Sequence, residues 1–273
     1  MKVIALEPEP IEVISFLNAG KGTGAFYTDS LRIHLGIVDQ LPAGTAAIVA
    51  TADLQGRETL KHASGKPPRL LGEVLPAILQ AAVFPTLNLP DGKIGAVLAG
   101  DFYTVPGLDK RGGSGDVTGV WRAFAGVFDW VVGVAGNHDT FGRDFESKPA
   151  LPPNSRLLDN KSTSIGNLKI AGLSGIIGNP SRPWRRTASD FVDSVVDLLS
   201  YRPDILIMHD GPDCPANGYP GVPMVRDAIA TSPPTFIVRG HAHWKHPLAE
   251  IDGGHQVLNV DARAVILIAQ PRL

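Results

Sequence analysis

The chain has 273 residues, a formal net charge of −2 and 44% hydrophobic residues. A chain of this length forms one large domain or two small ones, and its apolar content together with its small net charge excludes an intrinsically disordered protein. The near-neutral charge argues against sequence-independent nucleic-acid binding, which requires a basic surface. The single cysteine, Cys214, excludes an internal disulfide, as suits a reducing compartment.

The N-terminal stretch predicts neither a secretion signal nor a membrane span. Glu7, Glu9 and Glu12 and two prolines interrupt the region where a signal peptide needs apolar residues. No window approaches the roughly 18–20 consecutive apolar residues of a membrane-spanning helix. We therefore expect a soluble, cytoplasmic protein without membrane association.

Short apolar runs that end abruptly in polar or glycine-rich segments predict buried strands along the chain. In chain order these runs are 31–38, 45–51, 94–99, 130–135, 204–208 and 235–238, then two strands within 256–269 that are joined near Asp261; the N-terminal stretch is a further strand candidate. Helical spacing of apolar residues predicts helices over 70–84, 117–128, 187–201 and 222–229. Strands that alternate with helices predict an α/β layered domain.

No internal repeat and no long linker divides the sequence. We therefore expect a single domain over 1–273, with a core at about 45–245 and strand extensions at both ends.

Side chains that can bind metal ions follow five of the apolar runs directly. They are Asp53, Asp101, Asn137, His209, His241 and His243. Because sites in α/β sheets assemble in the loops at the carboxyl ends of strands, we expect these side chains to converge. An Asp at a strand end, taken alone, is as readily a turn or helix cap; the whole series favours a site for two divalent cations, with Asp101 as the natural bridge because a carboxylate has two oxygens.

The order of these residues resembles that of the calcineurin-like metallophosphoesterases. The matching elements are Asp53-Leu54-Gln55, Gly100-Asp101, Gly136-Asn137-His138-Asp139, His209 and Gly240-His241-Ala242-His243, and they extend from about residue 47 to 243. The resemblance implies a four-layer α-β-β-α sandwich with two central mixed sheets. It also implies a dinuclear metal centre in the loops between the sheets and hydrolysis of phosphomonoesters or phosphodiesters.

The resemblance further implies a role for each residue. Asp53 and His243 would bind the first ion, Asn137, His209 and His241 the second, and Asp101 both. His138 would contact the scissile phosphate and protonate the leaving oxygen. Asp139 would either orient the His138 imidazole or cap the following turn, and the sequence favours neither alternative.

Gln55 departs from the family pattern, which has a histidine at this position. An amide oxygen is a harder and weaker ligand than an imidazole nitrogen. We therefore expect the first site to bind with lower affinity and to prefer Mn²⁺ or Mg²⁺ over Zn²⁺, with Fe also compatible. The alternative is that Gln55 points away and water completes the shell.

Three further residues are candidates for substrate contact. Tyr103 and Arg111 lie in the stretch after Asp101, and Arg143 follows the Asn137-His138-Asp139 element. Arginine binds phosphate through paired hydrogen bonds, although a solvated surface is the default explanation for small basic clusters.

The sequence thus predicts a dinuclear metal-dependent phosphoesterase for a small-molecule substrate, with a slight preference for a phosphodiester such as a nucleotide. A metal-bridging hydroxide would attack phosphorus, with Asn137 and both cations stabilising charge and His138 as general acid. One alternative is a catalytically degenerate protein of the same fold that acts as a binding or scaffolding module. The presence of Gln55 in place of the usual histidine supports this alternative. A metal-dependent amidohydrolase is disfavoured. The His-x-His pair of that class lies at the start of the first barrel strand, whereas His241 and His243 lie near the end of this sequence. The sequence carries no signal for the oligomeric state.

Overall fold

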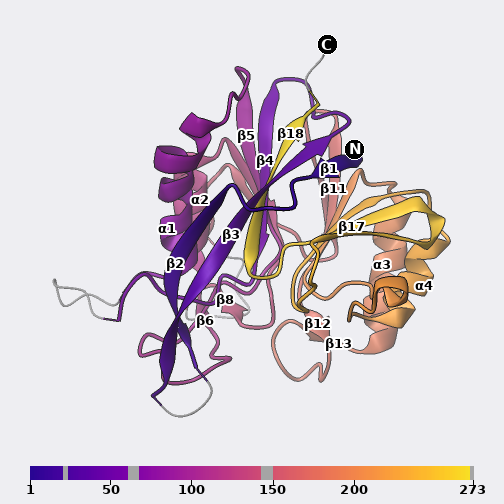
Figure 1. The fold of residues 1–273 in the computed structure, drawn as a ribbon. Helices are drawn as coiled ribbons and strands as arrows, with labels where there is room; N and C mark the ends of the chain where they lie inside the picture. The colour runs from indigo at the N-terminus through magenta and orange to yellow at the C-terminus, as the bar shows by residue number, and fades with distance from the viewer. Residues whose placement is uncertain (21–23, 61–67, 143–149, 271–273) are drawn as a thin grey trace.

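Two β-sheets packed face to face form the centre of the computed structural model, and helices cover both outer faces (Figure 1). The structure describes residues 1–20, 24–60, 68–142 and 150–270. A pair of helices covers the first sheet and another pair covers the second. The four-layer sandwich with two central mixed sheets, which the family resemblance implies, is therefore confirmed.

The first sheet has eight strands among the described residues, in the order β1-β3-β18-β4-β5-β7-β9, with β2 paired to β3. Their bounds are β1 (Val3–Leu6), β2 (Glu12–Ala19), β3 (Phe26–Val38), β4 (Thr45–Ala52), β5 (Lys93–Leu98), β7 (Trp130–Gly133), β9 (Ser155–Leu157) and β18 (Arg263–Ala269). Neighbouring pairs from β4 to β9 are parallel, whereas β18 runs antiparallel to β4. The carboxyl ends of β4, β5 and β7 therefore meet at one edge.

The second sheet has six strands in the part of the chain that is described, in the order β10-β11-β14-β15-β17-β16. Their bounds are β10 (Lys161–Ile165), β11 (Leu168–Leu173), β14 (Ile205–Met208), β15 (Phe236–Arg239), β16 (Leu248–Ile251) and β17 (His255–Asn259). The four inner strands are parallel. Two small parallel pairs complete the strands: β6 (Gly115–Asp116) with β8 (Asp139–Thr140), and β12 (Ile176–Ile177) with β13 (Arg185–Arg186).

The helices agree closely with the predicted ranges. They are α1 (Leu71–Ile78), which continues as η1 (Leu79–Val83) and η2 (Phe84–Thr86), α2 (Thr118–Val127), α3 (Ala188–Ser200), η3 (Pro215–Asn217), α4 (Pro223–Ala230) and η4 (Asp252–Gly254). The side chain of Thr187 accepts the N–H of Asp190 and so starts α3. Asp116 accepts the N–H of Thr118 at the start of α2.

The core lies in three layers, because each central strand is covered on both faces. Ile48 of β4 and Val97 of β5 face Ile207 of the second sheet. The alternate residue Val49 instead packs with Trp121 in the layer under α1 and α2. Strands covered on both sides read as unbroken apolar runs, which is why these strands could be predicted from the sequence.

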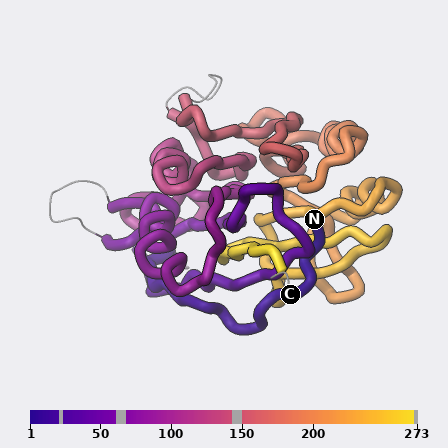
Figure 2. Tube along the Cα trace, turned by 90° about the horizontal axis from the view of Figure 1, so that it is seen from above, coloured from indigo at the N-terminus to yellow at the C-terminus, as the bar shows by residue number. Residues whose placement is uncertain are grey.

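The terminal strands, expected as extensions of the core, belong to the central sheets. In both Figure 1 and Figure 2 the yellow C-terminal strand β18 lies among the indigo and violet strands, paired with β3 and β4. The strands β9, β10, β11 and β16 had not been predicted. The β10 sequence, Lys-Ser-Thr-Ser-Ile, is mostly polar and forms a sheet edge, so it carries no apolar signal.

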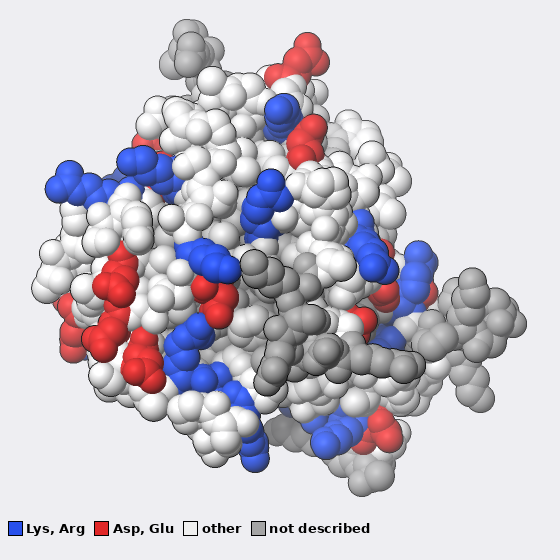
Figure 3. Space-filling model, turned by 180° about the vertical axis from the view of Figure 1, so that it is seen from behind, with Lys and Arg blue, Asp and Glu red and all other residues white. Residues whose placement is uncertain are grey.

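Charged side chains on the face turned away in Figure 1 are interspersed, and neither sign covers that face (Figure 3). No helix within the described ranges combines the length and the apolar composition that crossing a bilayer requires.

Candidate metal centre

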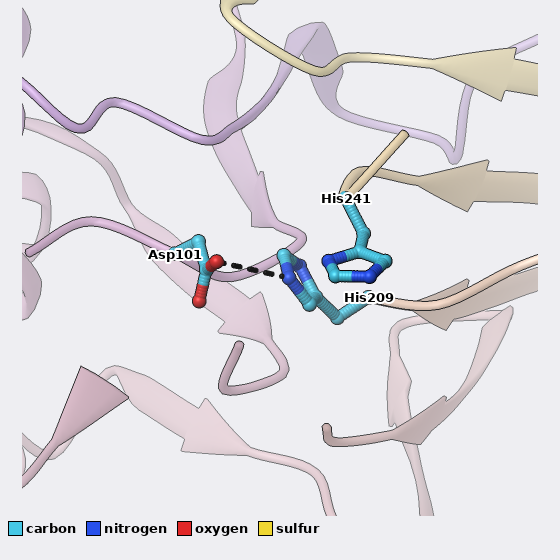
Figure 4. Close-up of side chains that lie close together, drawn as sticks. All are labelled: Asp101, His209 and His241. Atoms are coloured by element: carbon cyan, nitrogen blue, oxygen red, sulfur yellow. Dashed lines mark ion pairs between the residues drawn. The ribbon is translucent and has the colours of Figure 1, made fainter. Parts of the chain in front are cut away.

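The edge where the parallel strands end brings together side chains from both sheets. Asp53 follows β4 and Asp101 follows shortly after β5, while His209 and His241 follow β14 and β15 of the other sheet. The donor atoms of Asp101, His209 and His241 all lie within 4.8 Å of one another (Figure 4). This cluster of one carboxylate and two imidazoles could hold a metal ion.

A cavity of about 450 Å³ adjoins the cluster. Its lining includes seven of the predicted residues: Asp53, Gln55, Asp101, Arg111, His138, His241 and His243. It also includes side chains that the sequence had not indicated, among them Asn18, Thr104 and Asp261.

Asp101 makes the most contacts at the centre of the site. Its Oδ2 lies 3.3 Å from Nε2 of His209 and 3.9 Å from Nε2 of His138. The amide nitrogen of Gln55 donates to the same oxygen at 3.1 Å, and Oδ1 accepts the backbone N–H of His138 at 2.8 Å. Gln55 therefore contacts the predicted bridging carboxylate, and its coordination of a cation stays a prediction.

Two histidines are oriented by acceptors at Nδ1. Nδ1 of His209 lies 2.7 Å from the carbonyl oxygen of Ala99, which only accepts, so Nδ1 donates to it and Nε2 is turned toward Asp101. Nδ1 of His243 lies 2.8 Å from Oδ2 of Asp261. Metal-binding histidines are commonly fixed by such a bond at the second ring nitrogen.

Unpaired buried atoms test whether the site fits a cation. Oδ1 of Asn137 and Nε2 of His209 are buried and have no hydrogen-bond partner among the described residues. Leaving such a group unpaired costs about 1–3 kcal/mol. Ligation of a cation by both atoms removes this cost, so the donor set fits a metal centre.

Three of the predicted ligands have a left-handed backbone, with φ of 54° at Asp53, 59° at Asp101 and 69° at His241. This conformation costs about 1–2 kcal/mol for a residue with a side chain and is typical of functional sites. The strained turns are linked across the sheets, because Oδ2 of Asp53 accepts the backbone N–H of His241 at 2.9 Å. A side chain at Gly240 would overlap this oxygen, which explains the glycine before His241.

The Asp139 carboxylate joins two of the loops. It accepts the backbone N–H groups of Asp101 and Phe102 at 2.8 Å and of Gly136 at 2.9 Å. Nδ1 of His138 has no hydrogen-bond partner in the described residues. These contacts stabilise the backbone of loops that precede Asp139, which is neither of the two roles considered from the sequence.

The electrostatics of the site depend on burial and on close charges. Burial and the Asp101 charge raise the pKa of Asp139 to about 6. Burial alone would lower the pKa of His209, but the Asp101 and Asp53 carboxylates outweigh it and raise the pKa to about 10. Burial raises the pKa of Asp53 well above its usual value. Burial would also raise the pKa of Asp101, yet the His209 charge and hydrogen bonds leave it lowered.

The three candidates for substrate contact have different positions. Arg111 lines the cavity. Tyr103 packs against Gly115 and lies 6.0 Å from the Arg57 guanidinium, and it is not among the described cavity-lining residues. Arg143 lies outside the described residues.

Sequence reasoning missed Asp261 and Arg239. Asp261 follows β17, which is parallel to β15, so the rule that predicted the other site residues could have predicted it. Arg239 is fully buried, and its guanidinium donates to the carbonyl oxygens of Pro212, Pro220 and Gly240. It thereby holds the loops that follow His209 and precede His241, and burial lowers its pKa to about 10.

Comparisons with known proteins find the fold but no close relative. No protein-family model and no curated protein matches the sequence. The structure is similar to TT1561 of Thermus thermophilus, at 18% identity and a TM-score of 0.51, over 78% of this chain and 88% of that one. It is also similar to the sulfate thiohydrolase SoxB of Thermus thermophilus, solved with glycerol, at 14% identity and a TM-score of 0.39, over 82% of this chain and 53% of that one.

At these identities the similarity concerns the fold alone. The fold and the site define a mixed α/β sandwich with an Asp and His cluster suited to a metal ion. The four-layer α/β sandwich agrees with the architecture that the motif order implies.

Proposed function

We propose that this chain is a metal-dependent phosphoesterase that hydrolyses a phosphodiester or a phosphomonoester. The observation that carries the proposal is the convergence of the Asp101, His209 and His241 donor atoms within 4.8 Å, beside a cavity at the carboxyl ends of both sheets. Asp101 lies more than 100 positions before the two histidines in the chain.

Two divalent cations fit the donor set. Asp53 and His243 would hold one, Asn137, His209 and His241 the other, and Asp101 would contact both. Mn²⁺ is our first choice because oxygen donors contribute strongly, with Fe, Mg²⁺ and Zn²⁺ as the other candidates. When bound, such ions lower the pKa of water and neutralise charge on phosphoryl oxygens.

In the proposed reaction, side chains of the protein stabilise the phosphoryl group and supply a proton. His138 lines the cavity, and its backbone N–H donates to Asp101, so the backbone of His138 is fixed relative to that carboxylate. In the proposed role it delivers a proton to the departing oxygen, and the Asn137 amide stabilises charge on the phosphoryl group. Asp139 keeps the loops of both residues in register through its three backbone hydrogen bonds.

Hydrolysis of aryl phosphoesters tests the proposal. The metal-free protein, reloaded with Mn²⁺, Mg²⁺, Zn²⁺ or Fe²⁺, is assayed with bis(4-nitrophenyl) phosphate and 4-nitrophenyl phosphate. We expect turnover with at least one ion and its loss in Asp101→Asn, while Asp197→Asn on the exposed side of α3 keeps full activity. Absence of turnover with every ion would instead favour a degenerate binding or scaffolding protein.

A further inference from the structure

We propose that Arg111 selects substrates whose leaving group carries an anionic oxygen group, a carboxylate or a phosphate. The inference rests on the proposed phosphoesterase function and adds to it the chemical class of the leaving group.

The cavity has a single strong cation of its own among the described residues that line it. Arg111 is the one Lys or Arg in this set, whereas Asp53, Asp101 and Asp261 are acidic. In the described part of the chain Arg111 forms no ion pair with an acidic residue. Its charge is therefore available to a ligand.

The guanidinium of Arg111 is held in place by neutral acceptors. Its Nε donates to the carbonyl oxygen of Ala19 at 2.9 Å, and its Nη2 donates to the Tyr27 hydroxyl at 3.3 Å. Both acceptors belong to the hairpin of β2 and β3, and Nη1 makes no hydrogen bond within the described residues. A cation fixed in this way binds an anion without losing further side-chain freedom, which favours specificity.

The segment that carries Arg111 is joined to the hairpin, and the hairpin is joined to the loop that follows Gln55. The backbone N–H of Gly24 donates to the carbonyl oxygen of Asp109 at 3.4 Å. Leu17 of β2 exchanges two backbone hydrogen bonds of 2.9 Å with Arg57, shortly after Gln55. The hairpin therefore forms a wall of the cavity that is continuous with the metal-ligand loops.

Gly112 places Arg111 on the side of the leaving group. A Cβ added to Gly112 would lie 3.4 Å from Cε1 and 3.9 Å from Nε2 of His138. The segment thus runs along the edge of the ring that carries Nε2, the atom proposed to protonate the leaving oxygen. A leaving group attached to that oxygen would extend toward Gly112 and Arg111.

The size of the cavity agrees with this arrangement. Its volume of about 450 Å³ lies within the usual range of roughly 300–1,000 Å³ for small-molecule sites. The cavity can therefore hold an organic leaving group in addition to the phosphoryl group.

Binding of two matched phosphonates tests the inference. The probes are (3-carboxybenzyl)phosphonate and (3-carbamoylbenzyl)phosphonate, which resist hydrolysis and differ in one charge, and binding to the Mn²⁺-loaded protein is measured by calorimetry. We expect the wild-type protein to prefer the carboxylate roughly tenfold. We expect Arg111→Gln to bind both equally, and Arg111→Lys to keep part of the preference because the charge remains.

Lys110→Gln is the matched control, because Lys110 precedes Arg111 in the same exposed segment but does not line the cavity; it should keep the full preference. Three results would overturn the inference: the wild-type protein binds both probes equally, the preference for the carboxylate survives Arg111→Gln, or Arg111→Gln weakens the binding of both probes equally. Binding of neither probe contradicts the proposed function as well. If the wild-type protein binds both probes equally but hydrolyses an aryl phosphodiester, the inference about Arg111 is wrong and the proposed function stands.

Discussion

Replacement of Asp261 tests how the exposed His243 is held for metal binding. The His243 side chain is 68% exposed, whereas Asp261 is only 13% exposed. Little packing therefore orients the imidazole, and the 2.8 Å contact between Nδ1 and Oδ2 of Asp261 is its main restraint. The carboxylate also keeps the proton on Nδ1, so that Nε2 can act as a ligand.

We expect Asp261→Asn and Asp261→Ala to lower the affinity for one of the two cations by about 10–100-fold. This is the usual effect of removing the hydrogen-bond partner of a metal-binding histidine. This factor corresponds to about 1.4–2.8 kcal/mol. The alanine variant should be the weaker binder, because asparagine can still accept through its oxygen. The backbone of Asp261 bonds to Asn259 and Arg263, and these contacts remain in both variants.

The assay is competition with a chromogenic chelator, which resolves the two dissociation constants for Mn²⁺ or Zn²⁺. Asp252→Asn serves as the matched control, because it removes the same charge from an exposed turn outside the cavity. Unchanged constants for both ions in Asp261→Ala, with normal thermal stability, would refute the assignment of His243 as an oriented ligand.

Three further predictions concern the proton of His209, the proposed general acid His138 and the buried Arg239. Because the pKa of His209 is about 10 without a cation, a binding metal ion must displace its proton. The apparent affinity of the site for the cation should therefore rise about tenfold per pH unit between roughly pH 6 and 8. Calorimetry that shows the same affinity across this range would contradict the prediction. His138→Gln should lower turnover by about 10²–10⁴-fold with unchanged metal content, and equal loss of metal would argue for a ligand role. Arg239→Met should lower the free energy of unfolding by about 3 kcal/mol or more, and a urea midpoint like that of the wild type would refute its role in holding the loops.

The candidate metal ligands could be located in the sequence because of their positions after apolar runs. Asp53, Asp101 and His209 each follow an apolar run closely, and such runs become buried strands whose ends meet at one edge. The alternation of strands and helices predicted an α/β layered domain, and the family resemblance implied its four layers. These features depend on local signals and on one general property of α/β sheets.

The finer geometry could not be predicted, because it depends on contacts between distant segments. The left-handed backbone of Asp53 accompanies a hydrogen bond to His241, a residue 188 positions further along the chain. The hydrogen bond from Gln55 to Asp101 and the role of the β2–β3 hairpin likewise depend on pairing between distant segments. Asp139 shows the same limitation, since two of its hydrogen-bond partners lie in the loop at Asp101 and Phe102, and neither role considered from the sequence included them.

A crystal structure with anomalous diffraction collected at the Mn, Fe and Zn absorption edges would count the cations and locate each one. We expect two peaks that share Asp101, one beside Asp53 and His243 and the other beside Asn137, His209 and His241. The same map would show whether the Gln55 amide faces a cation or stays on Asp101. Crystals grown with excess metal that show no peak between these six side chains would contradict the metal centre, and with it the proposed hydrolysis.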